Sequence, residues 1–253
     1  MASRSADIAG LRPFYALHAD AYDQLITDPV EGWVRAVHDR LLADGVPQAA
    51  VLDAGCGTGR HAFGLIELGH EVTLLDASAA LLDIARQRCP GAPAYRGDIC
   101  ALDLEDTFQA ITCRGVLNDL VSDAERDAAL VSFMEALMPG GLLLLDVREA
   151  EGARRRADGV ERRADARLAD GSLLVFTSCP TWDDGLINVE ERYELTLPGS
   201  SATSTHAYRF QMRPWTTEEL QRRMAAAGFL DVEVRPGAGR QTPDRLFVVA
   251  RRP

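Results

Sequence analysis

The stretch "VLDAGCGTGRH", residues 51–61, decides the fold. It begins as an apolar strand, passes through three glycines at alternate positions, and continues into the helical pattern of "GRHAFGLIELG". A strand that runs through a glycine-rich turn into a helix forms the ligand-binding loop of Rossmann-type α/β proteins. A glycine pattern carries little weight alone, so its meaning depends on the segments around it.

Those segments alternate between strand-like and helical patterns. From residue 49 to 147 the apolar runs are "AAVLDA", "HEVTLLD", "APAYRG", "FQAITCR" and "GLLLLDV". Strands separated by short helices indicate βαβ units around a parallel sheet. Near the end of the chain, "DVEV" and "RLFVVAR" predict an antiparallel hairpin. We therefore expect an α/β fold with a Rossmann-like, doubly wound, mostly parallel seven-stranded sheet that ends in this hairpin.

Residues 149–213 follow a different pattern, which predicts an antiparallel β insertion. A charge-rich connection leads into runs that alternate with a period of two residues, as in "LINVEERYELTL". In that run Ile187, Val189, Tyr193 and Leu195 share one face. Together with "SLLVFTS" and the turn "DDG", the pattern predicts three or four antiparallel strands.

These patterns divide the chain into three parts. The parts are an N-terminal helical lid (1–44, with two helices over 8–44), a core (45–148 and 214–253) and the β insertion (149–213). We expect the insertion to contact the substrate or a second copy of the chain. The alternating strand 186–197 would be a sheet edge that needs cover, which makes a homodimer a reasonable expectation.

The charge balance excludes several classes of function. All 27 basic residues are Arg, and 38 acidic residues outnumber them, so the net charge is −11. An acidic chain has no general attraction to phosphate backbones, which argues against nucleic acid as a partner. Because the sequence contains no Lys, Schiff-base chemistry and the lysine of a P-loop are excluded.

Cysteine usage and apolar run length bear on the compartment. The five cysteines are odd in number and show no CxxC spacing, so we expect reduced thiols and no bound metal. The longest apolar runs fall far short of the roughly 20 residues of a membrane helix. The N-terminus "MASRSADIAG" has no apolar signal core. We therefore expect a cytoplasmic protein without a membrane partner.

Charged residues beside the glycine loop distinguish two classes of ligand. Asp76 ends the second strand about 20 positions after the glycines, where a carboxylate accepts hydrogen bonds from ribose hydroxyls. A dinucleotide fingerprint has Gly or Ala where this chain has Arg60. Asp53, beside the loop, would repel a pyrophosphate but attract an ammonium group. S-adenosylmethionine carries an ammonium group and an adenosine but no phosphate, so these residues favour it over NAD.

Four segments in order, "VLDAGCGTG", "VTLLDAS", "RGDI" and "LMPGGLLLLDV", resemble the motifs of class I S-adenosylmethionine-dependent methyltransferases. The resemblance implies methyl transfer from S-adenosylmethionine, with S-adenosylhomocysteine as the product. The insertion and "FYALHADAYDQL" look like the small-molecule type, and the nearest likeness is to amino-sugar N-methyltransferases of natural-product pathways. "GVLNDL" lacks the Asp/Asn-Pro-Pro-aromatic motif of adenine-directed enzymes, which disfavours a flipped base. We expect a small-molecule acceptor with an N or O nucleophile, in secondary metabolism.

The same resemblance implies which residues bind the cofactor. The implied positions are Asp53, Gly55 and Gly57 at the methionine part, Asp76 at the ribose, Ala77 under the adenine, Asp98 and Ile99 at its amino group and ring, and Arg114 closing the pocket. The N-terminal helix would fold over the cofactor as a lid.

A base would help to deprotonate an amine or hydroxyl acceptor. Most of the residues considered for the site around the acceptor also have an alternative interpretation in which their role is only structural. Tyr15, His18 and Tyr22 lie at i, i+3 and i+7, so a single helix would place them on one face over the cofactor. The two tyrosines would line the cofactor, or only pack the helix against the core. His18 is the candidate general base, because imidazole titrates near neutral pH. Asn118 and Asp119 would orient the acceptor as catalytic residues, or form a polar turn.

"LLLDVRE", residues 143–149, ends an apolar strand on charged residues. In an open parallel sheet, ligands bind beyond the carboxyl ends of the strands, so Asp146 and Arg148 are candidate substrate-binding residues. Arg148 would bind a carboxylate or phosphate of the substrate. Its alternative is an ion pair with Glu149 or with the 151–170 segment.

Two further charged features are expected to lie on the surface. His61, in the first turn after the glycines, is expected on the outer face of its helix. The "RRR" at 154–156 is expected to be a solvated face, with attraction of an anionic substrate as the alternative.

Two other functions stay open at this point. A methyltransferase-like protein such as a pathway cyclase would bind S-adenosylmethionine without ever releasing S-adenosylhomocysteine. An NAD-dependent oxidoreductase on a similar sheet is disfavoured by Arg60 and Asp53, and would bind nicotinamide instead.

Overall fold

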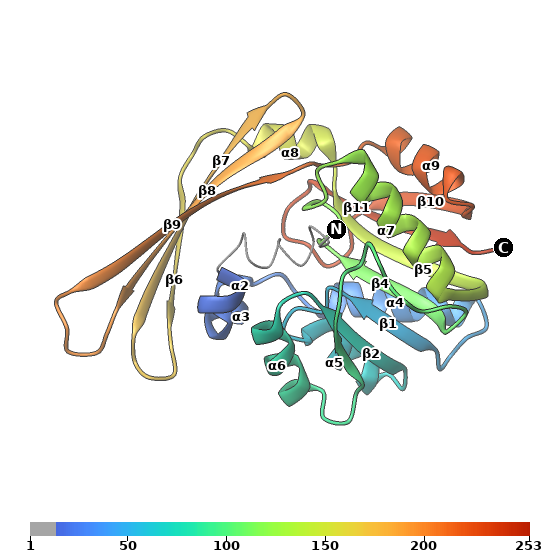
Figure 1. Ribbon diagram of the computed structural model, residues 1–253, viewed down its shortest axis with the longest axis horizontal. Coiled ribbons are helices and arrows are strands. Elements are labelled where there is room, and N and C mark those ends of the chain that lie inside the picture. The colour runs from blue at the N-terminus through green and yellow to red at the C-terminus, as the bar shows by residue number, and fades with distance from the viewer. Residues whose placement is uncertain (1–13) are drawn as a thin grey trace.

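A seven-stranded sheet forms the centre of the larger part of the molecule (Figure 1). The computed structural model describes residues 14–253. In spatial order the strands are β10 (Leu230–Pro236), β11 (Arg245–Arg251), β5 (Leu137–Arg148), β4 (Phe108–Arg114), β1 (Ala50–Ala54), β2 (Glu71–Asp76) and β3 (Ala94–Arg96). Neighbouring strands are parallel except where β11 pairs with β10 and β5. The predicted fold, including its final hairpin, is confirmed.

Helices cover both faces of this sheet. Successive strand residues point to opposite faces, so Val51 and Leu52 belong to two different buried clusters. The cluster of Leu52 includes side chains of α7 (Asp123–Ala136) and α9 (Thr217–Ala226), and that of Val51 includes side chains of α4 (Glu31–Ala43), α5 (Arg60–Glu67) and α6 (Ala79–Arg88). With both faces covered, the carboxyl ends of the parallel strands are the place where this fold binds ligands.

Local sequence signals set where several of these helices begin. Ser122 and Glu125 form a capping box at the start of α7, because the Ser122 hydroxyl accepts from the Glu125 amide and the Glu125 carboxylate accepts from the Ser122 amide. At the start of α6, the Ser78 hydroxyl accepts from the amide of Leu81 and so caps this helix. The cap at Ser78 matters for function, because it fixes the chain directly after β2.

The N-terminal part differs from the predicted pair of helices. Residues 1–13 of the predicted lid lie outside the described residues. From there the chain forms α2 (Phe14–Leu17), a 3₁₀ turn η1 (Ala19–Ala21) and α3 (Tyr22–Leu25) before the longer α4. α4 buries Trp33, Val37 and Leu41 against the sheet, so it belongs to the packed layer of the core.

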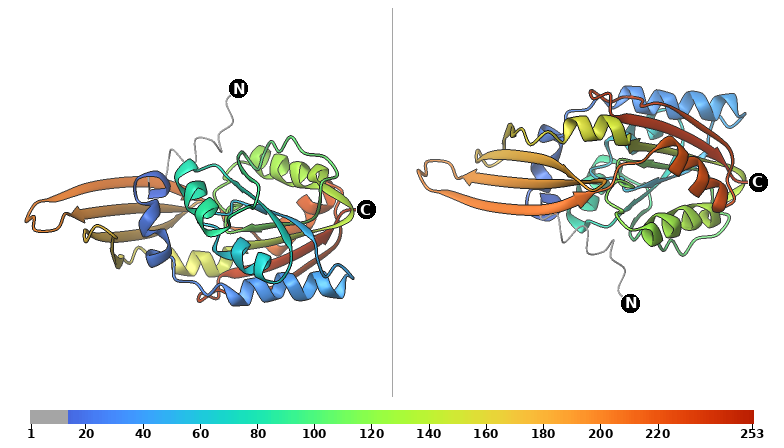
Figure 2. Two further views of the ribbon diagram at one scale, coloured as in Figure 1. Left: turned by 90° about the horizontal axis from the view of Figure 1, so that it is seen from below. Right: turned by 90° about the horizontal axis from the view of Figure 1, so that it is seen from above.

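The insertion forms a second, antiparallel sheet that projects from the core (Figure 1). Its strands, in order, are β6 (Arg162–Arg167), β7 (Leu173–Asp183), β8 (Leu186–Thr196) and β9 (Thr203–Met212), and α8 (Ala150–Arg156) precedes them. Asp184 and Gly185 join β7 to β8 with φ of +41° and +81°, as a tight hairpin turn requires. The segments α2 and α3 lie against this sheet (Figure 2).

The expectation that strand 186–197 is a sheet edge is wrong. β8 pairs along its length with β7 on one side and with β9 on the other. The edges of the second sheet are β6 and β9, and the first half of β9 is exposed. The homodimer that this expectation suggested stays a prediction. Over residues 14–253, no helix is both long enough and apolar enough to cross a membrane.

Candidate active site

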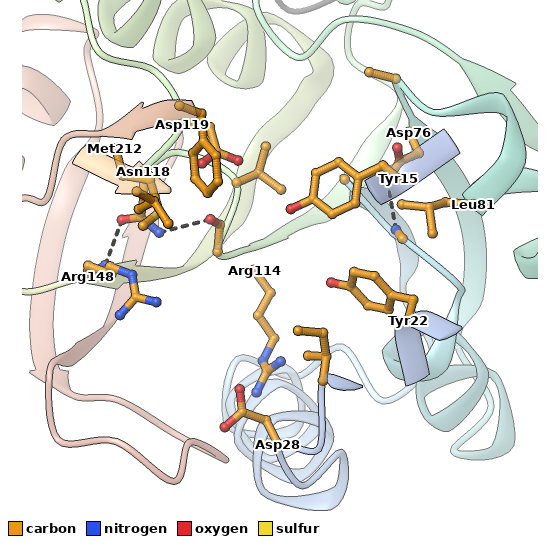
Figure 3. A pocket seen from close by; sticks show the side chains of 18 of the residues that line it. Tyr15, Tyr22, Asp28, Asp76, Leu81, Arg114, Asn118, Asp119, Arg148 and Met212 are labelled. Atoms are coloured by element: carbon orange, nitrogen blue, oxygen red, sulfur yellow. Dashed lines mark hydrogen bonds between the residues drawn. The ribbon is translucent and has the colours of Figure 1, made fainter. Parts of the chain in front are cut away.

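A cavity of about 410 Å³ lies where the carboxyl ends of β1, β2 and β4 face the second sheet. Its walls come from three parts of the chain: the glycine loop and strand ends of the core, the N-terminal segment before α4, and the inner face of the second sheet. Figure 3 shows side chains from opposite walls pointing toward one another across this space. The cavity therefore joins all three predicted parts of the chain.

The glycine loop brings backbone close to the cavity. Gly55 has φ of +78°, and a Cβ there would lie 2.3 Å from Cγ2 of Val116, so only glycine fits. The amide of Gly57 donates to Oδ2 of Asp76 at 2.8 Å, and the amide of Ser78 donates to Oδ1 at 2.8 Å. Burial raises the pKa of Asp76, while these two amide donors oppose the rise. The carboxylate of Asp76 is thus held rigidly at the cavity wall.

Asp53 lines the cavity at the end of β1 and is 3% exposed. The hydroxyl of Thr112 on β4 donates to its Oδ1 at 2.9 Å. Burial raises the pKa of Asp53 to about 6, and the hydrogen bond from Thr112 opposes part of that rise. A cation in this part of the cavity would favour the ionised carboxylate.

The chain after β3 also contributes to the cavity wall, next to the glycine loop and the end of β1. Gly97 and Ile99 line the cavity, and Asp98 stands between them. Oδ1 of Asp98 accepts from the amide of Cys100 at 2.8 Å, whereas its buried Oδ2 has no hydrogen-bond partner within the described part of the chain. A buried carboxylate oxygen in that situation suits a ligand that donates a hydrogen bond.

These features fit S-adenosylmethionine group by group. Asp53 offers a carboxylate to an ammonium group, Asp76 offers one to a pair of ribose hydroxyls, and Asp98 offers an acceptor to an adenine amino group. Apolar side chains of Leu75, Ala77, Leu81 and Ile99 line the same region of the cavity. The predicted cofactor residues therefore line one space, except Asp98, which stands between two lining residues and is not itself part of the cavity wall.

Arg114 ends β4 and lines the cavity near Asp28 (Figure 3). Its guanidinium donates to the carbonyl of Gly239 at 2.7 Å. Burial, with the charge of the nearby Arg240 as a second cause, lowers the pKa of Arg114 to about 10. Arg240 also lines the cavity, where it donates to Oδ2 of Asp28 at 2.7 Å and so ties the segment before α4 to the core.

Asp146 does not face the substrate side of the cavity, which corrects the prediction for this residue. Its carboxylate is fully buried and accepts from Arg240 and Arg245, which follow almost 100 positions later in the chain. Two guanidinium groups already satisfy this carboxylate, so it orders the loop that carries them. Asp146 is absent from the cavity wall, whereas Arg240 and Arg245 are part of it.

Arg148 and Asn118 both line the cavity but have different environments. The Asn118 side chain bonds backbone at both ends: Nδ2 donates to the carbonyl of Gly115 at 2.9 Å, and Oδ1 accepts from the amide of Arg148 at 2.7 Å. Asn118 thus fixes the ends of β4 and β5 rather than presenting its amide to a ligand. The Arg148 guanidinium pairs with the buried Asp244 at 2.5 Å, not with Glu149. Asp119 also lines the cavity (Figure 3).

Tyr15, His18 and Tyr22 do not share one helical face as predicted. α2 ends at Leu17, and His18 has φ of −133°, which breaks the helix between the two tyrosines. Tyr15 and Tyr22 line the cavity and point into it (Figure 3). His18 instead stacks on Tyr193 at 5.1 Å and is not among the lining residues. Burial lowers its pKa, with His206 as a second cause. The structure places the candidate general base away from the cavity.

The sequence did not predict several residues of the cavity wall. His61, expected on the outer face of its helix, instead lines the cavity and is half-buried, and desolvation together with the charge of Arg114 holds its pKa well below the usual value. Arg156, the last of the three consecutive arginines, lines the cavity 3.5 Å from Asp244. The second sheet adds one acidic side chain, Glu191. It also adds the apolar side chains of Phe176, Ile187, Val189, Phe210 and Met212.

A signal for Glu191 was present in the sequence. It falls on the same alternate series as Ile187, Val189 and Tyr193, so an acidic residue interrupts an otherwise apolar face. His61 gave no such signal, because Arg114 and Arg240, whose charges lower its pKa, are distant in sequence.

Within residues 14–253, no group of three or more His, Cys, Asp and Glu side chains is arranged to hold a metal ion. The five cysteines are all free.

Comparison with known proteins gives one consistent family. Residues 51–141 match the family described as "Methyltransferase domain". The chain is 30% identical over 194 residues to dTDP-3-amino-3,6-dideoxy-alpha-D-glucopyranose N,N-dimethyltransferase of Streptomyces fradiae, covering 75% of this chain and 72% of that protein.

Solved structures agree with this relationship. CalS10, an amino pentose methyltransferase from Micromonospora echinaspora solved with bound S-adenosylmethionine, is 28% identical with a TM-score of 0.75, covering 94% of this chain and 97% of that chain. DesVI of Streptomyces venezuelae is 25% identical with a TM-score of 0.77, covering 92% and 97%.

Proposed function

The chain belongs to the S-adenosylmethionine-dependent methyltransferases, and from that premise we propose that it methylates the amino group of a nucleotide-linked amino sugar in natural-product biosynthesis. The cofactor is S-adenosylmethionine, and the product formed from it is S-adenosylhomocysteine. The relatives that act on amino sugars support this choice of acceptor.

One observation carries the proposal: the glycine loop and the second sheet line the same cavity with side chains of different chemistry, so the cavity has two halves. The half at the glycine loop has the carboxylates that suit an adenosyl ligand. The half against the second sheet is lined by apolar side chains together with the charged residues Glu191 and Arg162. A ligand in one half would therefore face a ligand in the other, as transfer of a group between two molecules requires.

The cofactor half is proposed to act through three carboxylates. Asp53 holds the ammonium group, Asp76 holds the ribose hydroxyls and Asp98 accepts from the adenine amino group. When bound, S-adenosylmethionine supplies a methyl group on a positively charged sulfur. Tyr15 and Tyr22 exclude water from that position, and exclusion of water with alignment provides most of the rate in a displacement of this kind.

The acceptor half is proposed to hold an anionic part of the acceptor beside α8 and β6. Arg148, Arg156 and Arg162 line the cavity there, and each is 23–40% exposed. Guanidinium groups bind phosphate oxygens well because their donors are paired and planar. A diphosphate linked to a sugar would reach these groups while the sugar lies on the apolar wall.

The five free cysteines suit a reducing compartment, so we propose that the reaction takes place in the cytoplasm.

The test is turnover with dTDP-3-amino-3,6-dideoxy-D-glucose and S-adenosylmethionine. We expect one S-adenosylhomocysteine for each methyl group transferred to the sugar amine, and no product with the Asp76→Ala variant. Tight binding of S-adenosylmethionine without release of S-adenosylhomocysteine, for any amine or hydroxyl acceptor, would contradict the proposal and point to a protein that retains the cofactor without methyl transfer.

A further inference from the structure

One buried carboxylate stands among the apolar side chains of the acceptor half. Glu191 lies on the inner face of β8 in the same alternate series as Ile187 and Val189, and is 5% exposed. Its cross-strand neighbours are Tyr208 of β9 and Ser178 of β7, and Ser178 also lines the cavity. A carboxylate is costly to bury among apolar groups, so its presence on this face calls for a function beyond packing.

Glu191 is held in place by a residue that is itself immobilised. The hydroxyl of Tyr193 donates to Oε2 of Glu191 at 2.6 Å. The Tyr193 ring is 1% exposed and stacks against both Phe14 of α2 and Phe176 of β7, each with its ring centre at 5.1 Å. The N-terminal segment and the second sheet therefore fix the carboxylate jointly, and a charged group fixed before ligand binding loses little on binding.

The other acidic side chains of the cavity already have places in the site. Asp53 and Asp76 lie at the glycine loop, and Asp28 pairs with Arg240. Asp119 and Glu191 are the acidic groups that remain among the described lining residues. Of these two, Glu191 is the buried one and has apolar neighbours, and burial strengthens attraction between opposite charges.

We propose that Glu191 binds the protonated amino group of the acceptor and removes its proton before methyl transfer. This inference rests on the proposed function and concerns the reacting group of the acceptor. A proton passes from the acceptor nitrogen to the Glu191 carboxylate, which frees the nitrogen lone pair. That lone pair forms the N–C bond to the methyl group, while the electron pair of the broken C–S bond stays on sulfur. The methylated product leaves as a cation, and Glu191 returns its proton to solvent.

A pair of small probes tests the binding step without knowledge of the natural acceptor. Cyclohexylamine and cyclohexanol share an apolar ring that suits Phe176 and Val189, and differ in an ammonium group against a hydroxyl. With protein saturated by S-adenosylhomocysteine, we expect the amine to bind at least about tenfold more tightly. Glu191→Gln should abolish this preference. Glu190→Gln is the matched control, because Glu190 faces outward, is 50% exposed and pairs with Arg209.

Kinetics test the proton-transfer step. With the dTDP-amino sugar at neutral pH, Glu191→Gln should lower kcat/KM about 100-fold, a typical loss for removal of a general base. The loss should shrink as pH rises toward the pKa of the acceptor amine, since the amine then deprotonates unaided. Tyr193→Phe, which alters a positioning residue, should give a smaller loss with the pH profile of the wild type. The dissociation constant of S-adenosylmethionine should stay unchanged in Glu191→Gln, in Tyr193→Phe and in the control Glu190→Gln.

The outcomes separate this inference from the proposed function. If cyclohexylamine fails to bind more tightly than cyclohexanol, or if Glu191→Gln keeps the preference, the role of Glu191 is wrong even when methyl transfer occurs. If the amino sugar is not methylated but the preference for cyclohexylamine depends on Glu191, the proposed acceptor is wrong and the amine site stands.

Discussion

Asp53 accepts a hydrogen bond from the Thr112 hydroxyl at 2.9 Å in a place from which water is almost excluded. Burial raises the pKa of Asp53 to about 6, so the carboxylate changes charge just below neutral pH. An ammonium group binds the ionised form and not the protonated one. With Asp53 as the proposed site of the cofactor's ammonium group, we expect cofactor binding to depend on the protonation of Asp53.

We expect the affinity for S-adenosylmethionine to fall as pH decreases below about 6, by up to about tenfold per pH unit. Calorimetry in buffers of different ionisation enthalpy should show proton release on binding near pH 6. Asp53→Asn should bind weakly at every pH and show no such dependence. In Thr112→Val, loss of the hydrogen bond that stabilises the carboxylate should move the midpoint to higher pH. A midpoint unaffected by both substitutions would assign the titration to another group.

Asp76 supports both the loop and the proposed ribose site. Asp76→Ala removes a charged acceptor for two hydroxyls, each such bond being worth about 1.5–3 kcal/mol. Affinity for S-adenosylmethionine and S-adenosylhomocysteine should fall at least about 100-fold, as measured by calorimetry. Asp83→Ala, an exposed acidic residue on α6, is the control and should bind as the wild type does. Equal binding by Asp76→Ala and the wild type would refute the ribose assignment.

The core of the fold was predictable because its signals are local. Each strand and helix between residues 49 and 147 has its own periodicity, and the capping residues Ser122 and Glu125 mark a helix start within four positions. The order of strands in a sheet depends on partners elsewhere in the chain. The pattern of 186–197 therefore predicted a strand correctly but could not show that β7 and β9 flank it.

The site was predictable only where its residues belong to the loop and strand ends of one motif. Asp146 ends a strand, as a ligand-binding residue would, but Arg240 and Arg245 approach it from a loop almost 100 positions later. His18 fits a helical spacing with Tyr15, but the helix ends at Leu17 and His18 packs on Tyr193 of the insertion. In both cases a contact between distant segments overrides a local pattern.

Arg148 joins the proposed anion site to the buried Asp244. In Arg148→Ala we expect KM for the acceptor to rise about tenfold with kcat and cofactor affinity little changed, because the lost contact holds a non-reacting part of the acceptor. The free energy of unfolding should also fall by about 1–3 kcal/mol, because Asp244 loses its nearer partner while Arg156 remains 3.5 Å away.

A double variant separates these two effects. Arg148→Met with Asp244→Asn removes both charges, so it should recover most of the stability but none of the acceptor affinity. If KM returns to the wild-type value when stability is restored, Arg148 acts on the acceptor only through the fold.

The environment of His70 predicts that the free energy of unfolding depends on pH. Its Nδ1 accepts from the amide of Ala49 at 3.1 Å, so its proton lies on Nε2, 2.9 Å from Nδ1 of His38. A second proton on Nδ1 would face the Ala49 amide hydrogen at the start of β1. Burial lowers the pKa of His70, and His38 lowers it further.

Below the unfolded pKa of about 6.5, the unfolded chain therefore binds more protons than the folded one, so the free energy of unfolding should fall as pH decreases, by at most about 1.4 kcal/mol per pH unit for this histidine. His70→Asn keeps an acceptor for the Ala49 amide and does not titrate. Urea unfolding between pH 5 and 7.5 should show a weaker pH dependence for this variant than for the wild type. Parallel curves for the two proteins would mean that His70 does not contribute to acid sensitivity, and that His18 or His61, whose pKa values burial also lowers, accounts for it.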